Sequence, residues 1–404
     1  MKNSIRKSIE NIGCSLLVLM IIFPNVLQIP KALLLGIVLV GIVIMKRKHM
    51  INATHIGWIS VYVFTNLFYI FYGAALSNPA PLKYFPVYVL WPLIFFFLAQ
   101  NITHRVLYCF FKIFTGCLAF INITGIVAFI LFNFVGFDSF LVFLPLIKPG
   151  FPFVAISGPI VTSFIFLFFF NLTLVLISKR KTKLEIINVI LGIIFILLTC
   201  RRVLFLNIAI GIFVISFFSF MSGTYKKIVL AKVFKFIIGA LILFFLTFSL
   251  AISYADFSFS DFLNLVINAF GDGDINDPRV DQSLALFNGW LEHPILGNGT
   301  GVDAQVSRSE LPGTYELSYH AMLFERGILG CLIYFILYTK LNMWCLQSMK
   351  YSILDDKYTI AYLVALTLFM MANATNPYLN AFDYLWILFL GFVFCNKKFS
   401  VCEI

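Results

Sequence analysis

Continuous apolar stretches close to 20 residues long recur along this chain, and they limit what it can fold into. Such a stretch crosses the hydrocarbon core of a bilayer as a helix, whereas the strands of a membrane β-barrel alternate over about ten residues. Of the 404 residues, 61% are hydrophobic and 12% are charged, against about 25% charged in an average soluble domain. Because helices satisfy their own backbone hydrogen bonds in lipid, we expect an all-α polytopic membrane protein.

The apolar stretches fit about twelve transmembrane helices. The first has a basic start and lacks a small-x-small cleavage site, so we expect a retained helix rather than a removed signal peptide. The expected spans cover roughly residues 11–29, 31–45, 56–77, 86–101, 109–134, 154–178, 184–200, 203–223, 234–255, 319–339, 358–376 and 383–396.

Lysine and arginine divide unevenly between the two sides that these spans define. With the N-terminus inside, the cytoplasmic loops hold 21 of the 29 basic residues. The eight others lie on the opposite side or at helix ends: Lys31, Lys83, Lys148, Arg201, Arg202, Arg279, Arg308 and Arg326. Positive charge collects in cytoplasmic loops, so both termini are expected in the cytoplasm. This topology also explains the net charge of +11 without a nucleic-acid partner.

One long polar segment interrupts the apolar pattern. Residues 1–255 would form an N-terminal bundle of about nine spans, 256–318 an extracytoplasmic loop, and 319–404 about three further spans. The loop holds ten of the 18 acidic residues and the two arginines Arg279 and Arg308. A loop this long favours a functional role. It should contain a short helix, because Leu284, Phe287 and Leu291 have helical spacing.

Arginines near the outer membrane edge are candidate ligands for an anion. Arg201 and Arg202 lie between two apolar spans, and the planar fork of arginine suits phosphate oxygens. Alternatively, they are snorkelled hairpin charges. Arg279 falls near the start of the short helix, where a cation opposes the helix dipole. It should therefore meet an anionic ligand or an acidic neighbour such as Asp277 or Asp281. Arg308 is a further substrate-binding candidate.

His320 is the candidate general base. It follows the loop at the outer edge of a span, and histidine can take a proton from a hydroxyl near neutral pH. Glu316 and Tyr319 are close enough in sequence to orient it and to contact substrate. The alternative is a histidine that only hydrogen-bonds at the interface. Deeper in the same span, Arg326 and Glu325 are expected to pair with each other or with Asp383.

No motif for a metal or a cofactor emerges. Asp272, Asp274, Asn276 and Asp277 fail the calcium-loop template, which needs glycine at the sixth position and glutamate at the twelfth. The eight cysteines are scattered without metal-ligand spacing. We therefore expect no metal and no cofactor.

The order of these features resembles the O-antigen ligase/polymerase family of bacterial membrane glycosyltransferases. An arginine hairpin precedes a long outer loop with Arg279, a short helix ending in HPILGNGTG, and then His320-x6-Gly327-x2-Gly330. The resemblance covers about Leu198 to Phe335, with Ala321 where the family often has asparagine.

The resemblance implies a metal-independent, inverting glycosyl transfer at the periplasmic face of the bacterial inner membrane. The donor is a glycan on undecaprenyl pyrophosphate, and the acceptor of a polymerase is another lipid-linked repeat unit. His320 and Arg279 would be catalytic, with Arg201, Arg202, Arg308, Glu316 and Tyr319 binding the pyrophosphate or the substrate. A chain-length regulator protein is a further expected partner in lipopolysaccharide biosynthesis.

Two alternatives stay open at this point. A ligase would transfer the finished glycan onto lipid A-core by the same chemistry. The aromatic-rich, lysine- and asparagine-rich, alanine-poor composition is more similar to that of a polymerase. A flippase or other transporter of lipid-linked oligosaccharide would also have about twelve spans. It should carry charges deep in the bundle and an internal repeat, whereas most outer charges here collect in one loop.

The topology is testable by cysteine labelling. A cysteine introduced at Ser307 in the long loop should react with a membrane-impermeant maleimide in spheroplasts that are intact. One at Lys181, in a basic cytoplasmic loop, should react only after permeabilisation. The opposite pattern would reverse the orientation.

Overall fold

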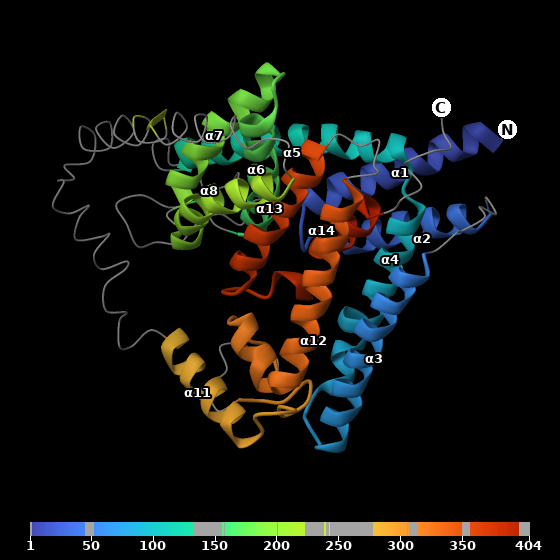
Figure 1. Cartoon of the computed structure of the whole chain (residues 1–404), viewed down its shortest axis with the longest axis vertical. Helices are drawn as coiled ribbons and strands as arrows, with labels where there is room; N and C mark the ends of the chain where they lie inside the picture. Colours follow the sequence, from blue (N-terminus) through green and yellow to red (C-terminus); the bar gives the residue numbers. More distant parts are fainter. Residues whose placement is uncertain are drawn as a thin grey trace. The chain divides into compact units, whose positions relative to one another are not determined.

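The computed structural model describes residues 2–44, 52–132, 156, 158–199, 201–222, 238–239, 242, 278–304, 306, 313–349 and 356–395 (Figure 1). Within these residues all regular secondary structure is helical, and no strand occurs. The helices are α1 (Lys2–Ile22), α2 (Gln28–Ile44), α3 (Ala53–Ala75), η1 (Pro81–Tyr84), η2 (Pro86–Leu90), α4 (Trp91–Asn101), α5 (His104–Ile130), α6 (Pro159–Ile177), α7 (Lys183–Thr199), α8 (Arg202–Ser222), α11 (Pro278–Glu292), α12 (Ser318–Ser348), α13 (Asp356–Asn373), η5 (Tyr378–Asn380), η6 (Phe382–Tyr384) and α14 (Leu385–Phe394).

Long apolar helices dominate the described part of the chain and confirm a helical multi-pass membrane protein. Six are long and apolar enough to cross a bilayer: Ala53–Ala75, Pro81–Asn101, His104–Ile130, Pro159–Ile177, Arg202–Ser222 and Ser318–Ser348. Gln28–Ile44 and Phe382–Phe394 are shorter apolar helices. The number twelve stays a prediction, and most of the expected span 234–255 lies outside the described residues.

The chain divides into two compact units that interleave along the sequence. The first comprises Met1–Lys46, Thr103–Gly271 and Ser352–Met371, and the second comprises Arg47–Ile102, Asp272–Tyr351 and Ala372–Ile404. The residues after the long loop therefore do not form a unit of their own. The predicted boundaries at 255 and 318 describe topology across a membrane, and they stay a prediction.

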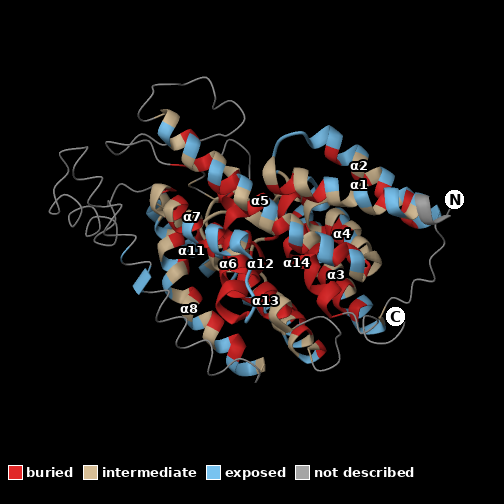
Figure 2. Ribbon diagram, turned by 90° about the horizontal axis from the view of Figure 1, so that it is seen from above, coloured by how far each residue is buried: buried red, intermediate tan, exposed pale blue. Residues whose placement is uncertain are grey.

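Helix α6 is the core of the first unit. It contacts α1, α5, α7 and α8, and nearly all of its residues are buried (Figure 2). Asparagine amides link the surrounding helices: Asn122 donates to the Asn188 carbonyl over 3.1 Å, and Asn188 donates to the Thr115 carbonyl over 2.9 Å. Such bonds hold helices together where lipid offers no hydrophobic drive for association.

The second unit is built around α12, which contacts α3, α11 and α14, while α14 also packs on α4. The Trp58 indole on α3 donates to the Leu337 carbonyl on α12 over 2.7 Å. Gly327 interrupts α12 with non-helical backbone angles (φ 58°, ψ −170°), so the helix consists of two segments joined by a sharp kink. This kink organises the site described below.

Gly125 tests the packing of the first unit. A Cβ at this position of α5 would overlap the Phe195 ring, whereas a Cβ at Gly116 on the same helix would meet nothing within 4 Å. Gly125→Ala should lower the free energy of unfolding by about 1–3 kcal/mol through overpacking. Gly116→Ala should leave it unchanged or raise it by up to about 1 kcal/mol. Thermal unfolding in detergent measures both, and equal effects would contradict the packing.

Candidate functional site

A turn at Pro294–Gly301, called here the glycine turn, replaces the hydrogen bonds that the kink in α12 breaks. In a continuous helix the Ile328 and Leu329 N–H groups would donate to the Phe324 and Glu325 carbonyls. The turn supplies new backbone partners to these four groups. The Asn298 and Gly299 N–H groups donate to the Phe324 (2.9 Å) and Glu325 (2.8 Å) carbonyls. The Ile328 and Leu329 N–H groups donate to the Pro294 (3.0 Å) and Ile295 (3.1 Å) carbonyls. The kink thus leaves none of these four helix groups without a partner.

Glycine is required on both sides of this junction. Gly327 has a positive φ, and a Cβ there would overlap the Ile295 carbonyl. Gly297 also has a positive φ (69°), and its Cβ would lie 2.5 Å from the Arg326 backbone nitrogen. An L side chain at either position would be strained and would push the turn away from the helix.

The other side of the glycine turn holds the C-terminal end of α3. The Thr300 N–H donates to the Tyr69 carbonyl over 3.0 Å. The Asn78 side chain donates to the Asn298 carbonyl over 2.9 Å. Gly299 approaches Gly73 so closely that its Cβ would lie 2.5 Å from the Gly73 Cα. The turn therefore links α3 to the kink of α12.

Arg326, next to the kink, is buried among tyrosines. Only 4% of this residue is exposed. Its guanidinium carbon lies 4.5 Å from the centre of the Tyr88 ring and 4.8 Å from that of Tyr334, and the guanidinium donates a hydrogen bond to the Tyr334 hydroxyl. That hydroxyl in turn donates to Asn66 over 2.7 Å. We call Arg326, Tyr88, Tyr334 and Asn66 the arginine cage.

The expected ion pairs between Arg326, Glu325 and Asp383 do not involve Arg326 in the structure. Arg326 forms a salt bridge with neither Glu325 nor Asp383, and its Nε has no hydrogen-bond partner within the described residues. Adjacent helical residues point about 100° apart, which separates Glu325 from Arg326. The buried Glu325 carboxylate instead faces the glycine turn and accepts a long bond (3.4 Å) from the Gly301 N–H.

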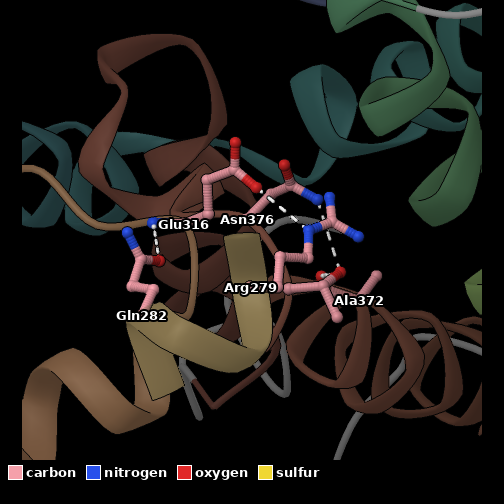
Figure 3. Close-up of polar contacts among 6 residues, drawn as sticks. Arg279, Gln282, Glu316, Ala372 and Asn376 are labelled. Carbon is pink, nitrogen blue, oxygen red and sulfur yellow. Dashed lines mark hydrogen bonds and ion pairs between the residues drawn. The ribbon is translucent and has the colours of Figure 1, made fainter. Parts of the chain in front are cut away.

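Arg279 pairs with Glu316, at the other end of the first α12 segment. The Arg279 Nε donates to the Glu316 carboxylate over 3.1 Å, with 43% and 33% of the two side chains exposed. The ion-pair partner is therefore an acidic residue, but it is Glu316 and not Asp281, one of the two acidic neighbours named from the sequence; the other, Asp277, lies outside the described residues. Figure 3 shows Arg279 between Glu316 and Ala372, with Asn376 beside its guanidinium. The buried Gln282 side chain accepts the Glu316 N–H over 3.2 Å.

The start of α12 belongs to the same neighbourhood. The Ser318 N–H donates to the Ala374 carbonyl over 3.2 Å, and Tyr319 follows in the first turn of α12. His320 is exposed, and no hydrogen bond of its imidazole occurs within the described residues. Four of the predicted site residues, Arg279, Glu316, Tyr319 and His320, thus gather where α11 and α12 begin.

A small apolar cluster fixes α11 against α12. Leu286, Tyr315 and Phe324 pack together in the interior. The Tyr315 hydroxyl donates to the Val302 carbonyl and accepts the Ala304 N–H, both over 2.7 Å. Burial raises the pKa of Tyr315 well above its usual value, so the hydroxyl stays a neutral donor. This cluster places Arg279 of α11 beside Glu316.

The remaining predicted residues lie elsewhere or outside the described residues. Arg201 is half-buried and Arg202 is exposed, at the start of α8 in the first unit. Their part in binding pyrophosphate stays a prediction. Arg308 and the segment Asp272 to Asp277 lie outside the described residues. No group of three histidine, cysteine or acidic side chains within the described residues could hold a metal ion.

Sequence reasoning missed the arginine cage. The sequence predicts only that Arg326 pairs with Glu325 or with Asp383. The other members of the cage come from three elements that are far apart in the chain: Asn66 from α3, Tyr88 from η2 and Tyr334 from α12. No local spacing reveals that they meet.

Comparison with known proteins adds no family assignment. No protein-family model matches the chain, and no curated protein matches it either.

The arginine cage is testable through stability. Arg326→Lys should lower the free energy of unfolding by about 2 kcal/mol or more, because an ammonium cannot stack as a plane between two rings. Arg279→Lys is the matched control: its half-exposed ion pair should contribute no more than about 1 kcal/mol. Thermal unfolding in detergent compares the two, and equal melting temperatures would contradict a structural role for the cage.

Proposed function

We propose that this protein is a membrane glycosyltransferase of the O-antigen polymerase type. It would transfer a glycan from undecaprenyl pyrophosphate onto another lipid-linked repeat unit at the periplasmic face of the inner membrane. The observation that carries the proposal is the gathering of a paired, accessible arginine and an exposed histidine where α11 and α12 begin. The reaction needs both groups: a cation for the leaving pyrophosphate and a base for the acceptor hydroxyl.

The proposed reaction is a displacement at the anomeric carbon of the donor sugar. A hydroxyl of the acceptor sugar attacks the anomeric carbon of the donor, and a new carbon–oxygen bond forms as the bond to the pyrophosphate oxygen breaks. His320 takes the hydroxyl proton, and undecaprenyl pyrophosphate leaves with the bonding electrons. The attack from the opposite face inverts the anomeric centre, as the resemblance implies.

Arg279 is assigned to the leaving group. Its guanidinium carries a permanent positive charge and can bind phosphate oxygens in a planar, bidentate manner. Glu316 accepts from Nε, which sets the plane of the guanidinium. Because 43% of the Arg279 side chain is exposed, a lipid phosphate can reach it. Arg201, Arg202 and Arg308 are proposed as further contacts to the pyrophosphate, and Tyr319 to the substrate.

The proposed membrane location and partners follow from the same family resemblance. The protein would lie in the bacterial inner membrane with both termini in the cytoplasm, and the site would face the periplasm. The bilayer supplies donor and acceptor as lipids, and a chain-length regulator protein would act beside the enzyme. A ligase would use the same residues with lipid A-core as acceptor, so the acceptor used by purified protein distinguishes the two.

One observation favours a second candidate, a transporter of lipid-linked oligosaccharide. Such a protein should carry charges deep among its helices, and the side chains of Glu325 and Arg326 are both buried. A flippase would move a fluorescent lipid-linked oligosaccharide across liposomes without changing its glycan. A polymerase would lengthen the glycan without requiring that movement.

His320 provides the decisive variants. With purified protein and synthetic lipid-linked repeats, His320→Ala and His320→Gln should reduce transfer by about 10²–10⁴-fold, because a positioned acid–base group is lost. Binding of the lipid-linked donor should persist through the arginines. His293→Gln is the matched control in the preceding loop: His293 is exposed, and transfer should stay near wild type.

The measurement requires equal amounts of folded protein, established by thermal unfolding of each variant. Wild-type transfer by His320→Gln would reject the role as general base, while leaving Arg279 as a separate question. Absence of any glycan extension by the wild-type protein, together with lipid movement in liposomes, would favour the transporter.

A further inference from the structure

The outward face of α11 is apolar. Val280, Leu284, Phe287 and Leu291 are each 41–55% exposed. At about 100° per residue, these four side chains fall within an arc of about 60° on the helix. We call them the apolar strip. Between Asp281 and Glu292 the helix carries no charged residue, which is unusual for a helix whose outward face meets water.

The opposite face of α11 is already occupied by protein. Leu286 is fully buried in the cluster with Phe324, and a Cβ at Gly289 would overlap the Phe324 ring. The apolar strip is therefore not needed to attach α11 to α12. A helix with one packed face and a second, unpartnered apolar face requires another apolar environment.

The apolar strip continues into the exposed surface of a membrane span. Ile295, 68% exposed, follows the end of α11 at Glu292 after two residues, and its carbonyl accepts the Leu329 N–H of α12. Ile328 and Leu329 are themselves 46% and 44% exposed. From there α12 presents further exposed apolar side chains along its long segment: Leu332, Phe335 and Ile336. One apolar surface therefore runs from the span onto α11.

The position of α11 beside the membrane-spanning helices of the second unit agrees with a continuous apolar surface. In Figure 1, α11 lies at the level of the C-terminal half of α3, a helix long and apolar enough to cross a bilayer. The exposed polar residues Asp281, Asn288 and Glu292 flank the apolar strip on one side. This separation of apolar and polar strips is the pattern of a helix at a membrane surface.

We propose that α11 is partly embedded in the membrane, with the apolar strip inserted among the acyl chains of the leaflet that surrounds the kink of α12. Asp281 and Glu292 then face the headgroups and water. The occupant is bilayer lipid, because the strip is continuous with the surface of a membrane span. This inference does not depend on the proposed glycosyl transfer.

Lipid quenching on the full-length protein tests the proposal. Leu284→Cys, Phe287→Cys and Leu291→Cys, each in a background with the native cysteines replaced, are labelled with a small environment-sensitive fluorophore. The protein is reconstituted in nanodiscs of phosphatidylcholine and phosphatidylglycerol. Lipids with nitroxides on the acyl chains should quench these three labels several-fold more strongly than iodide in the buffer does. Asp281→Cys and Glu292→Cys are controls on the same helix and should show the opposite preference.

Two results would overturn the proposal. Quenching of the strip by iodide and not by nitroxide lipids would place the strip in water. Protection from both quenchers would mean that protein covers it, either this chain or a second copy. If the background without cysteines fails to fold, benzoylphenylalanine at Phe287 in the native sequence replaces the labels. Its photo-adducts should add the mass of a lipid, whereas adducts to protein would contradict the inference.

Discussion

The exchange of backbone hydrogen bonds at Gly327 is the interaction on which the second unit depends. A helix broken inside a membrane protein would leave buried carbonyl and N–H groups unsatisfied, at several kcal/mol for each. The glycine turn removes this cost by supplying two donors and two acceptors in the right places. Because the same turn binds the Tyr69 carbonyl of α3, one short segment determines how two helices meet.

Everything at the candidate site follows from that junction. The kink sets the direction of the segment from Ser318 to Arg326, and the packing of Phe324 on Gly289 and Leu286 brings α11 alongside. Arg279 and Glu316 then meet next to His320. At the opposite end of the segment, Arg326 is enclosed by tyrosines. The accessible arginine suits an anionic ligand, whereas the buried one suits a structural role that holds the junction.

The buried arginine illustrates how a membrane protein can accommodate a charge without a salt bridge to a carboxylate. The faces of two tyrosine rings and one hydroxyl surround the guanidinium. Electron-rich ring faces attract a cation most strongly where water is excluded. Glu325 is buried nearby and faces the glycine turn instead. The two side chains therefore contact different sides of the junction and form no salt bridge with each other.

Sequence alone determined the class of fold, because only helices reconcile apolar stretches of about 20 residues with a backbone that must bond internally. It also indicated the helix at Arg279 to Leu291 and singled out His320 and three residues that lie near it, since local spacing and polarity carry that information. Only the tertiary structure decided that Arg279 pairs with Glu316, and that Arg326 meets Tyr88 rather than Asp383. These partners lie far apart in the chain, and no local pattern encodes a contact that depends on how whole helices pack.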